Sequence, residues 1–264
     1  MAVIDASGVR YSYPDGTLAV DGVDVTVEAG ERVALLGPNG AGKSTLLQLL
    51  GGLLDLDAGT VRYFGETTDA DTVRDRLSVL TQNPADYLFN PTVREDLAYG
   101  PKQLALTEDE VDRRVKRIAD RLDLDGLLSK PPFRLSGGQQ RRAALASALT
   151  VEPDVLLLDE PLSNVDATNR ATILELLDEL ADDGATLVIS TPDTELVPQV
   201  ADRVILLDAA GEIAAVGPTR ELLTDTALLA DCRLRPPQVV RLFESRFDRP
   251  PLTVAEAANR LDGR

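Results

Sequence analysis

The sequence predicts an α/β fold with a mainly parallel core sheet, antiparallel strands at the N-terminus and a helical insertion. Residues 155–158 and 186–189 are continuous apolar runs, which are typical of parallel strands buried on both faces. Residues 23–28 alternate between apolar and polar side chains, and this pattern favours an antiparallel strand with one buried face. Residues 92–150 are charged and have helical spacing, so we expect helices between the two strand regions.

In chain order, N-terminal strands with turns at 14–16 and 29–30 come first. The strands expected in the core are 32–36, 155–158, 186–189 and 204–207. The helices expected around them are 43–50, 108–122 and 168–182. We expect one main domain at 1–225, with a helical subdomain at about 90–150. Proline pairs at 236–237 and 250–251 mark a C-terminal helical extension at 226–264.

The sequence indicates where in the cell the protein is located. No apolar run approaches the roughly 20 residues that span a bilayer, so no membrane span is predicted. Residues 1–10 lack a basic segment followed by an apolar one, so no secretory signal is predicted either. The single cysteine, Cys232, excludes an intrachain disulfide and is expected to be a partly buried small hydrophobe. These observations predict a cytoplasmic protein.

The chain is strongly acidic, with a net charge of −17 from 29 Asp, 15 Glu, 23 Arg and 4 Lys. No basic stripe stands out, so we expect no nucleic-acid partner. An aspartate-rich, lysine-poor surface stays hydrated where salt screens ordinary repulsion, which gives the hypothesis of a high-salt cytoplasm. The alternative is a solvated acidic surface without such adaptation. Measuring the stability of the protein across salt concentrations distinguishes the two. A protein that is as stable in dilute buffer as in high salt would contradict the high-salt hypothesis.

Residues 37–45 fit the pattern G-x-x-x-x-G-K-[ST], which lies here between an apolar strand and a helix and is typical of a phosphate-binding loop. Its glycines let the backbone curl, so that successive N–H groups point into one concavity that can hold phosphate oxygens. Lys43 adds a charge for the β- and γ-phosphates, and the Ser44 hydroxyl can ligate Mg²⁺. The helix that follows directs its positive end at the same anion. The loop residues expected to bind nucleotide are Gly37, Pro38, Asn39, Gly40, Ala41, Gly42, Lys43, Ser44 and Thr45.

Two acids, Asp159 and Glu160, end the apolar strand at 155–158. Strands often end in an acid for no catalytic reason. Downstream of a phosphate loop, however, Asp159 can hold Mg²⁺ through water, and Glu160 can polarise the attacking water as a general base.

The turn Leu-Ser-Gly-Gly-Gln at 135–139 precedes a helix that continues to residue 149. On one interpretation Ser136 only caps that helix beside a flexible glycine pair. On the other, Ser136 and the backbone N–H groups form a second anion site at a positive helix end. Two separate phosphate-binding surfaces on one chain indicate a nucleotide clamped between two copies.

In this order, the loop 37–45, the turn 135–139 and the strand end 155–160 resemble the ATP-binding cassette of ABC proteins, and the resemblance covers about residues 3–220. It implies ATP and Mg²⁺ as cofactors. It also implies that Tyr13 stacks on adenine, with Tyr11 as an alternative, and that Gln82 senses Mg²⁺ and touches a membrane subunit. The loop 163–166 matches the one that crosses the dimer interface. The implied catalytic residues are Glu160, Gln82 and Lys43, the implied metal ligands are Ser44, Gln82 and Asp159, and the implied contacts with a second subunit's nucleotide are Ser136, Gly137, Gly138, Gln139 and Asp166.

A narrower resemblance involves residues 81–89, 91–96 and 99–101, which are similar to the ATPase subunits of energy-coupling factor transporters, including cobalt and nickel importers of the CbiO kind. The segment 251–256 is also similar to their tail, which contributes to pairing of the two ATPases. This implies a motor for uptake of a metal ion or vitamin, at the cytoplasmic face of the membrane. The implied partners are a second ATP-binding subunit, a transmembrane coupling subunit and a substrate-capture membrane protein.

One position departs from the family. After the strand 186–189, ABC proteins place a histidine that contacts the γ-phosphate, whereas this chain has Pro192 between Thr191 and Asp193. Proline has neither a side-chain donor nor an N–H, so we expect this site to bind ATP and hydrolyse it slowly. Two interpretations stay open. The chain pairs with a histidine-bearing second ATPase, or it forms a homodimer in which Glu160 and Gln82 suffice.

Two other functions remain as alternatives. A soluble ABC protein of translation or DNA repair usually carries two fused cassettes or a long coiled-coil insertion, and this chain has one cassette with a short insertion. A regulatory subunit with weak hydrolysis is supported only by Pro192.

Overall fold

The computed structural model describes residues 1–163 and 165–262, and their arrangement confirms the predicted α/β class. A six-stranded sheet has the strand order β5-β6-β7-β3-β8-β9. Its strands β5, β6, β7, β3 and β8 are parallel, and β9 is antiparallel to β8. The strands of this sheet are β3 (Arg32–Leu36), β5 (Leu77–Leu80), β6 (Val155–Asp159), β7 (Thr186–Thr191), β8 (Arg203–Leu207) and β9 (Ile213–Pro218).

A separate three-stranded antiparallel sheet has the order β2-β1-β4, from β1 (Ala2–Ser12), β2 (Leu18–Glu28) and β4 (Ala58–Tyr63). The alternating pattern at 23–28 predicted β2. By contrast, β4, β5 and β9 were not expected. β4 and β5 owe their places to pairing with strands distant in sequence, whereas β9 pairs with the preceding strand β8.

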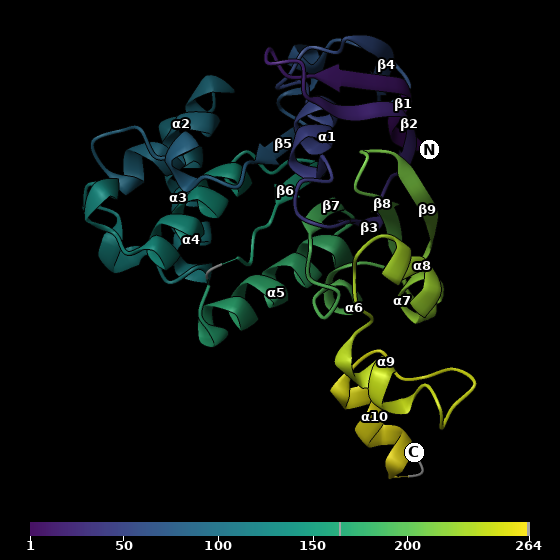
Figure 1. The fold of residues 1–264 in the computed structure, drawn as a ribbon. Coiled ribbons are helices and arrows are strands. Elements are labelled where there is room, and N and C mark those ends of the chain that lie inside the picture. The colour runs from purple at the N-terminus through teal and green to yellow at the C-terminus, as the bar shows by residue number, and fades with distance from the viewer. Residues whose placement is uncertain (164, 263–264) are drawn as a thin grey trace.

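Three helices form a lobe to one side of the sheets, α2 (Val93–Gln103), α3 (Glu108–Arg121) and α4 (Gly137–Leu149) (Figure 1). Residues 92–150 therefore supply the helices expected there. The helices packed nearer the sheets are α1 (Lys43–Leu50), α5 (Ala167–Asp182), α6 (Val197–Val200), α7 (Thr219–Thr224) and α8 (Thr226–Asp231). The division at residue 225 stays a proposal. It falls between α7 and α8, and Leu229 of α8 still packs in the main core.

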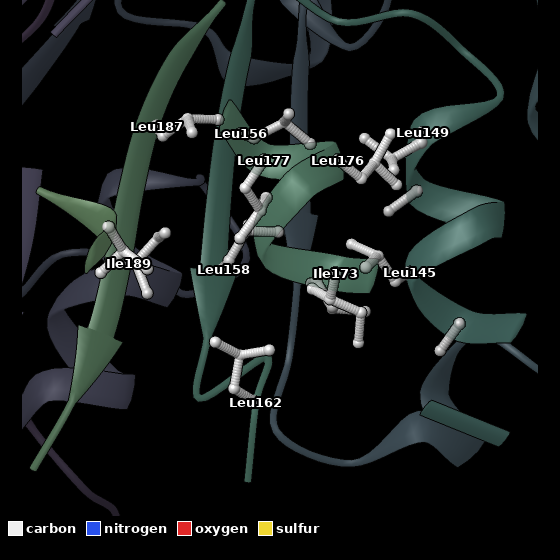
Figure 2. Close-up of a cluster of buried hydrophobic side chains, with 14 of the residues drawn as sticks. Leu145, Leu149, Leu156, Leu158, Leu162, Ile173, Leu176, Leu177, Leu187 and Ile189 are labelled. Atoms are coloured by element: carbon white, nitrogen blue, oxygen red, sulfur yellow. The ribbon is translucent and has the colours of Figure 1, made fainter. Parts of the chain in front are cut away.

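The central sheet has a hydrophobic cluster on each face, which explains its continuous apolar strands. In β6, Leu156 and Leu158 enter one cluster, and Val155 and Leu157 enter the other. Successive side chains of a strand point to opposite faces, so a strand covered on both sides has no polar position. Figure 2 shows the first cluster, where β6 and β7 meet α5 and α4 through Leu156, Leu158, Leu187, Ile189, Ile173, Leu176, Leu177, Leu145 and Leu149. Because β6 is fixed on both faces, the acids at its end are held at a defined edge of the sheet.

The C-terminal helices α9 (Gln238–Phe243) and α10 (Val254–Leu261) form a small cluster of their own at the end of the molecule far from the antiparallel sheet (Figure 1). Glu256 ties them to α7. Its carboxylate accepts hydrogen bonds from Arg220 at 2.9 and 3.0 Å and from the Leu252 N–H at 2.9 Å. Burial raises the pKa of Glu256, but the hydrogen bonds from Arg220, Leu252 and Arg260 outweigh it, and the pKa lies below its ordinary value.

We expect the docking of α9 and α10 to weaken at acid pH. The ionised Glu256 carboxylate stabilises the docked state above its ordinary pKa of about 4.5, and that contribution is lost as the pH falls through the lowered value. Hydrogen-exchange protection factors for residues 254–261 should therefore drop below pH 4.5. Glu256→Gln should lower them already at neutral pH, whereas Glu244→Gln, at an exposed carboxyl, should not. Flat protection from neutral to acid pH would contradict the prediction.

Candidate nucleotide site

The phosphate-type loop joins the end of β3 to the start of α1. Gly42 is the residue before α1 and has a left-handed backbone with φ of 80°. The Lys43 ammonium folds into the loop and donates to the carbonyls of Gly37 and Pro38 at 2.9 Å each. Burial lowers the pKa of Lys43, while Glu160 and Asp159 nearby raise it. The loop is thus built around a buried cation whose partners are neutral carbonyls, which suits exchange for a more strongly accepting anion.

A cavity of about 480 Å³ opens over this loop. Besides the loop residues Asn39, Gly40 and Gly42–Thr45, its lining includes four residues singled out from the sequence, Tyr13, Gln82, Glu160 and Pro192. Segments far apart in the sequence meet here because parallel strands end at the same edge of the sheet. Thr17, Leu18 and Ala19 also line the cavity, and nothing in the sequence pointed to them.

Tyr13 lies in this cavity with its hydroxyl 2.8 Å from the Thr45 hydroxyl oxygen, in a hydrogen bond that joins the antiparallel sheet to the loop. The Tyr11 ring supports it edge-on, at 5.2 Å between ring centroids and an interplanar angle of 85°. Tyr11 itself packs against the core beneath the antiparallel sheet. Of the two candidates, Tyr13 has the placement to stack on a base.

The two acids after the apolar strand have different surroundings. Asp159 is buried; one carboxylate oxygen accepts a hydrogen bond from the Ser190 hydroxyl, and the other has no partner among the described residues. Glu160 has a left-handed backbone with φ of 46°, which for a residue with a side chain marks local strain. Its carboxylate accepts a hydrogen bond of 2.6 Å from Ser163. Strain at Glu160 and an unpaired buried oxygen at Asp159 are both typical of a functional site.

The turn Ser136–Gln139 is a regular helix cap that lies outside this cavity. The Ser136 hydroxyl accepts from the Gln139 N–H at 3.3 Å, and the Gln139 side chain accepts from the Ser136 N–H at 3.0 Å. Asp166 likewise caps α5 by accepting from the N–H groups of Thr168 and Asn169 at 3.1 Å each. Asn164, in the loop 163–166, lies outside the described residues. One chain therefore does not bring these residues to its own loop.

Gly42 and Gly211 both face the carbonyl oxygen of Ala19 in β2. A Cβ atom would lie 2.1 Å from that oxygen at Gly42 and 2.5 Å from it at Gly211. The antiparallel sheet thus packs on the loop through bare backbone, with no space for a side chain.

We expect Gly42→Ala to destabilise the protein by about 3 kcal/mol, because it adds a steric overlap to a left-handed backbone. Gly40 is a matched control, since its φ is 83° and a Cβ there meets nothing within 4 Å. Gly40→Ala should cost only about 1 kcal/mol of strain. Denaturant unfolding of both variants measures the difference in free energy of unfolding. Equal losses in the two variants would contradict the prediction and show that the Ala19 carbonyl moves aside to accommodate the new methyl group.

The fold and the cavity define a phosphate-loop nucleotide-binding protein, and comparisons with known proteins narrow the class. The family model for ABC transporters matches residues 20–163. This chain belongs to the ABC transporter family and is one of its ATP-binding ATPases.

Its relatives match over nearly their whole length. A putative ABC transporter ATP-binding protein of Methanothermobacter marburgensis is 40% identical, over 99% of this chain and 98% of the relative. The energy-coupling factor transporter ATP-binding protein EcfA of Methanococcus maripaludis is also 40% identical, with the same coverage. Among solved structures, cbiO1 of Clostridium perfringens, part of the transporter complex cbiONQ, has a TM-score of 0.74 at 32% identity over 92% of this chain and 99% of its own. A dimeric ATP-binding cassette in a post-hydrolysis state with ADP and Pi has a TM-score of 0.74 at 28% identity, over 82% of this chain and 99% of its own.

Proposed function

We propose that this chain is the ATP-hydrolysing motor subunit of an energy-coupling factor importer, which drives uptake of a metal ion or vitamin through a partner membrane subunit. The observation that carries the proposal is the 40% identity to the EcfA protein across 99% of this chain. Residues 81–101, whose sequence pointed to these importers, form the rim of the nucleotide cavity at Gln82 and a neighbouring apolar cleft.

In the proposed site, the loop and Lys43 hold the phosphates of ATP, and Tyr13 stacks on the adenine. The residues present fit Mg²⁺, because Asp159 offers a buried carboxylate oxygen with no other partner among the described residues. Ser44 and Gln82, which line the cavity, supply further oxygens, and Asp159 directly precedes Glu160 of the cavity lining. Bound Mg²⁺ would neutralise charge on the phosphates. Glu160, which lines the same cavity, then orients and deprotonates the attacking water.

Two subunits are needed to complete each site. The turn Ser136–Gln139 and the cap Asp166 lie outside the cavity of their own chain, so we infer that they contact ATP on a second subunit. The N-terminus of α4 suits that role because it presents N–H groups and a positive helix end. The second subunit is either a copy of this chain or a histidine-bearing ATPase, the two arrangements that Pro192 leaves open.

The membrane subunit is proposed to dock at an apolar cleft of about 370 Å³ between the core and the helical lobe. Phe89 and Tyr99 line it as an edge-on aromatic pair with 5.0 Å between centroids, and both rings are exposed. Buried Asp96 fixes the Phe89 backbone by accepting its N–H at 3.0 Å. An exposed aromatic patch of this kind marks an interaction surface. Asp86 and Arg74 add charges to the cleft lining.

None of the described helices is long and apolar enough to cross a bilayer. On the similarity to the EcfA protein, we propose that the chain lies at the cytoplasmic face of the membrane, held there by its partners. The transported substrate binds the substrate-capture protein, and no nucleic acid takes part. The high-salt hypothesis stays a prediction.

Purification of the tagged full-length chain from solubilised membranes tests the proposal. We expect a polytopic membrane protein to co-purify, and mass spectrometry shows whether a second ATPase accompanies it. Phe89→Ser should lower recovery of the membrane protein. Phe133→Ser, at a still more exposed phenylalanine outside the cleft, should not lower it. A purely soluble complex would overturn the transporter assignment and favour the soluble ABC protein or the regulatory subunit.

A further inference from the structure

Arg141 connects the helical lobe to two walls of the nucleotide cavity. It lies in α4, two residues after the turn Ser136–Gln139, and its side chain is buried. One guanidinium nitrogen donates to the backbone carbonyl of Glu160 at 2.9 Å, and another donates to the backbone carbonyl of Gln82 at 3.0 Å. A single side chain thus joins the proposed second-subunit contact to the proposed base and the proposed Mg²⁺ sensor.

The surroundings of Arg141 are unusual for a buried cation. Within residues 1–163 and 165–262, no ion pair of Arg141 is found, and its hydrogen bonds go to carbonyls. Burial lowers the pKa of its guanidinium, and the carboxylates of Glu160 and Asp159 raise it. Guanidinium stays protonated in proteins, so both donors are always present. The two donors of this one side chain bind acceptor carbonyls on two separate segments and so hold these segments in a fixed relation to each other.

The neighbouring Arg142 offers a comparison within the same helix. It is buried to a similar degree, and its guanidinium also donates to a carbonyl, that of Leu122 at 2.8 Å. Leu122 ends α3, inside the helical lobe and away from the nucleotide cavity. Arg142 therefore connects two helices within the lobe, whereas Arg141 binds carbonyls of Glu160 and Gln82 outside it.

Helix α4 can carry a displacement from its first turn to Arg141. The reciprocal cap between Ser136 and Gln139 makes the turn continuous with the helix, and Arg141 lies only two residues, about half a helical turn, further along it. A shift of Ser136 therefore moves Arg141 with it, and Arg141 in turn moves the carbonyls that it holds.

We propose that Arg141 is a positioning residue that couples the two sites of the ATPase pair. The proposal rests on the function proposed above. When the turn Ser136–Gln139 closes on the nucleotide of the second subunit, α4 shifts, and Arg141 sets the position of Glu160 and Gln82 in this chain's own cavity. Binding at one site thus determines whether the base at the other is aligned.

The test is Arg141→Met in the full-length chain, measured as steady-state ATP hydrolysis and as equilibrium ATP binding. Methionine fills similar volume without a donor. We expect kcat to fall about 10²-fold, because a displacement near 1 Å of a catalytic group costs that much. ATP binding and KM should stay close to wild type, since Arg141 lies outside the loop that holds the phosphates. Arg141→Lys, which keeps the charge and reaches one carbonyl, should restore part of kcat.

Arg142→Met is the matched control and should lower the melting temperature without changing kcat. If Arg141→Met does not fold, Arg141→Gln, which retains one amide donor, takes its place. Equal kcat in the Arg141 and Arg142 variants would overturn the coupling role, as would an Arg141 variant that changes only the melting temperature. Absence of ATP hydrolysis in the wild-type complex would instead contradict the proposed function.

Discussion

Glu160→Gln should lower ATP hydrolysis about 10²–10³-fold while leaving ATP binding intact. The glutamine side chain has the size of glutamate and can still accept from Ser163, but it cannot take a proton from water. Glu160 is the acidic residue among those that line the cavity over the loop, and its backbone is left-handed. Single-turnover kinetics measure the loss of hydrolysis, and equilibrium ATP binding shows whether the affinity for ATP is unchanged.

Glu152→Gln is the control for this prediction. Glu152 is also a glutamate with a left-handed backbone, with φ of 57°, but it pairs with Arg114 and Arg117 on the helical lobe. Its replacement should leave kcat unchanged. A Glu160→Gln enzyme with more than about a tenth of wild-type kcat would show that another group acts as the base.

Pro192→His should raise ATP hydrolysis by about 10²-fold, because it supplies a positioned donor to the developing charge on the γ-phosphate. Pro192 lines the cavity together with Glu160 and Gln82. The residues beside it already form a turn, in which the Asp193 N–H donates to the Thr191 hydroxyl at 3.0 Å. Because Pro192 lines the cavity, we expect a histidine at this position to face it.

Pro192→Ala is the control for this prediction, because it distinguishes the effect of adding a side-chain donor from the effect of removing the proline ring. Alanine relaxes the fixed proline dihedral without adding a side-chain donor, so turnover should stay near wild type. The rise in the histidine variant should occur in the isolated chain if it forms a homodimer, and also at its own site in a mixed pair. Unchanged turnover of the isolated protein would show that Pro192 does not limit hydrolysis.

Local sequence patterns predicted much of this molecule. The apolar runs that became β3, β6, β7 and β8 are specified by burial on both faces, which leaves a pattern visible in a short window. The strand β5 is only four residues long, and its parallel pairing with β6 is what identifies it as a strand. Pairing between residues nearly eighty positions apart leaves no local pattern, so β5 could not be predicted.

The candidate site shows the same division. The loop 37–45 was recognisable because its conformation depends on its own glycines. Arg141 was missed because its importance lies in two carbonyls of other segments, and any arginine on the buried side of a helix looks alike in sequence. Ser163 and Ser190, which hold the carboxylates of Glu160 and Asp159, were missed for the same reason.

The close contact of the Ala19 carbonyl with Gly42 and Gly211 fixes the position of the N-terminal hairpin relative to the loop 37–45. Tyr13 belongs to the same hairpin as Ala19, so the ring proposed to stack on the base and the loop proposed to hold the first phosphates are joined through this contact. In the proposed site this unit would hold the adenine and the first phosphates of ATP and of ADP in the same place, and Lys43 would be the loop's contact with the γ-phosphate. The other groups proposed to respond to the γ-phosphate, Gln82, Glu160 and Pro192, follow other strands of the sheet, so we expect discrimination between ATP and ADP to depend on the approach of these segments to the loop.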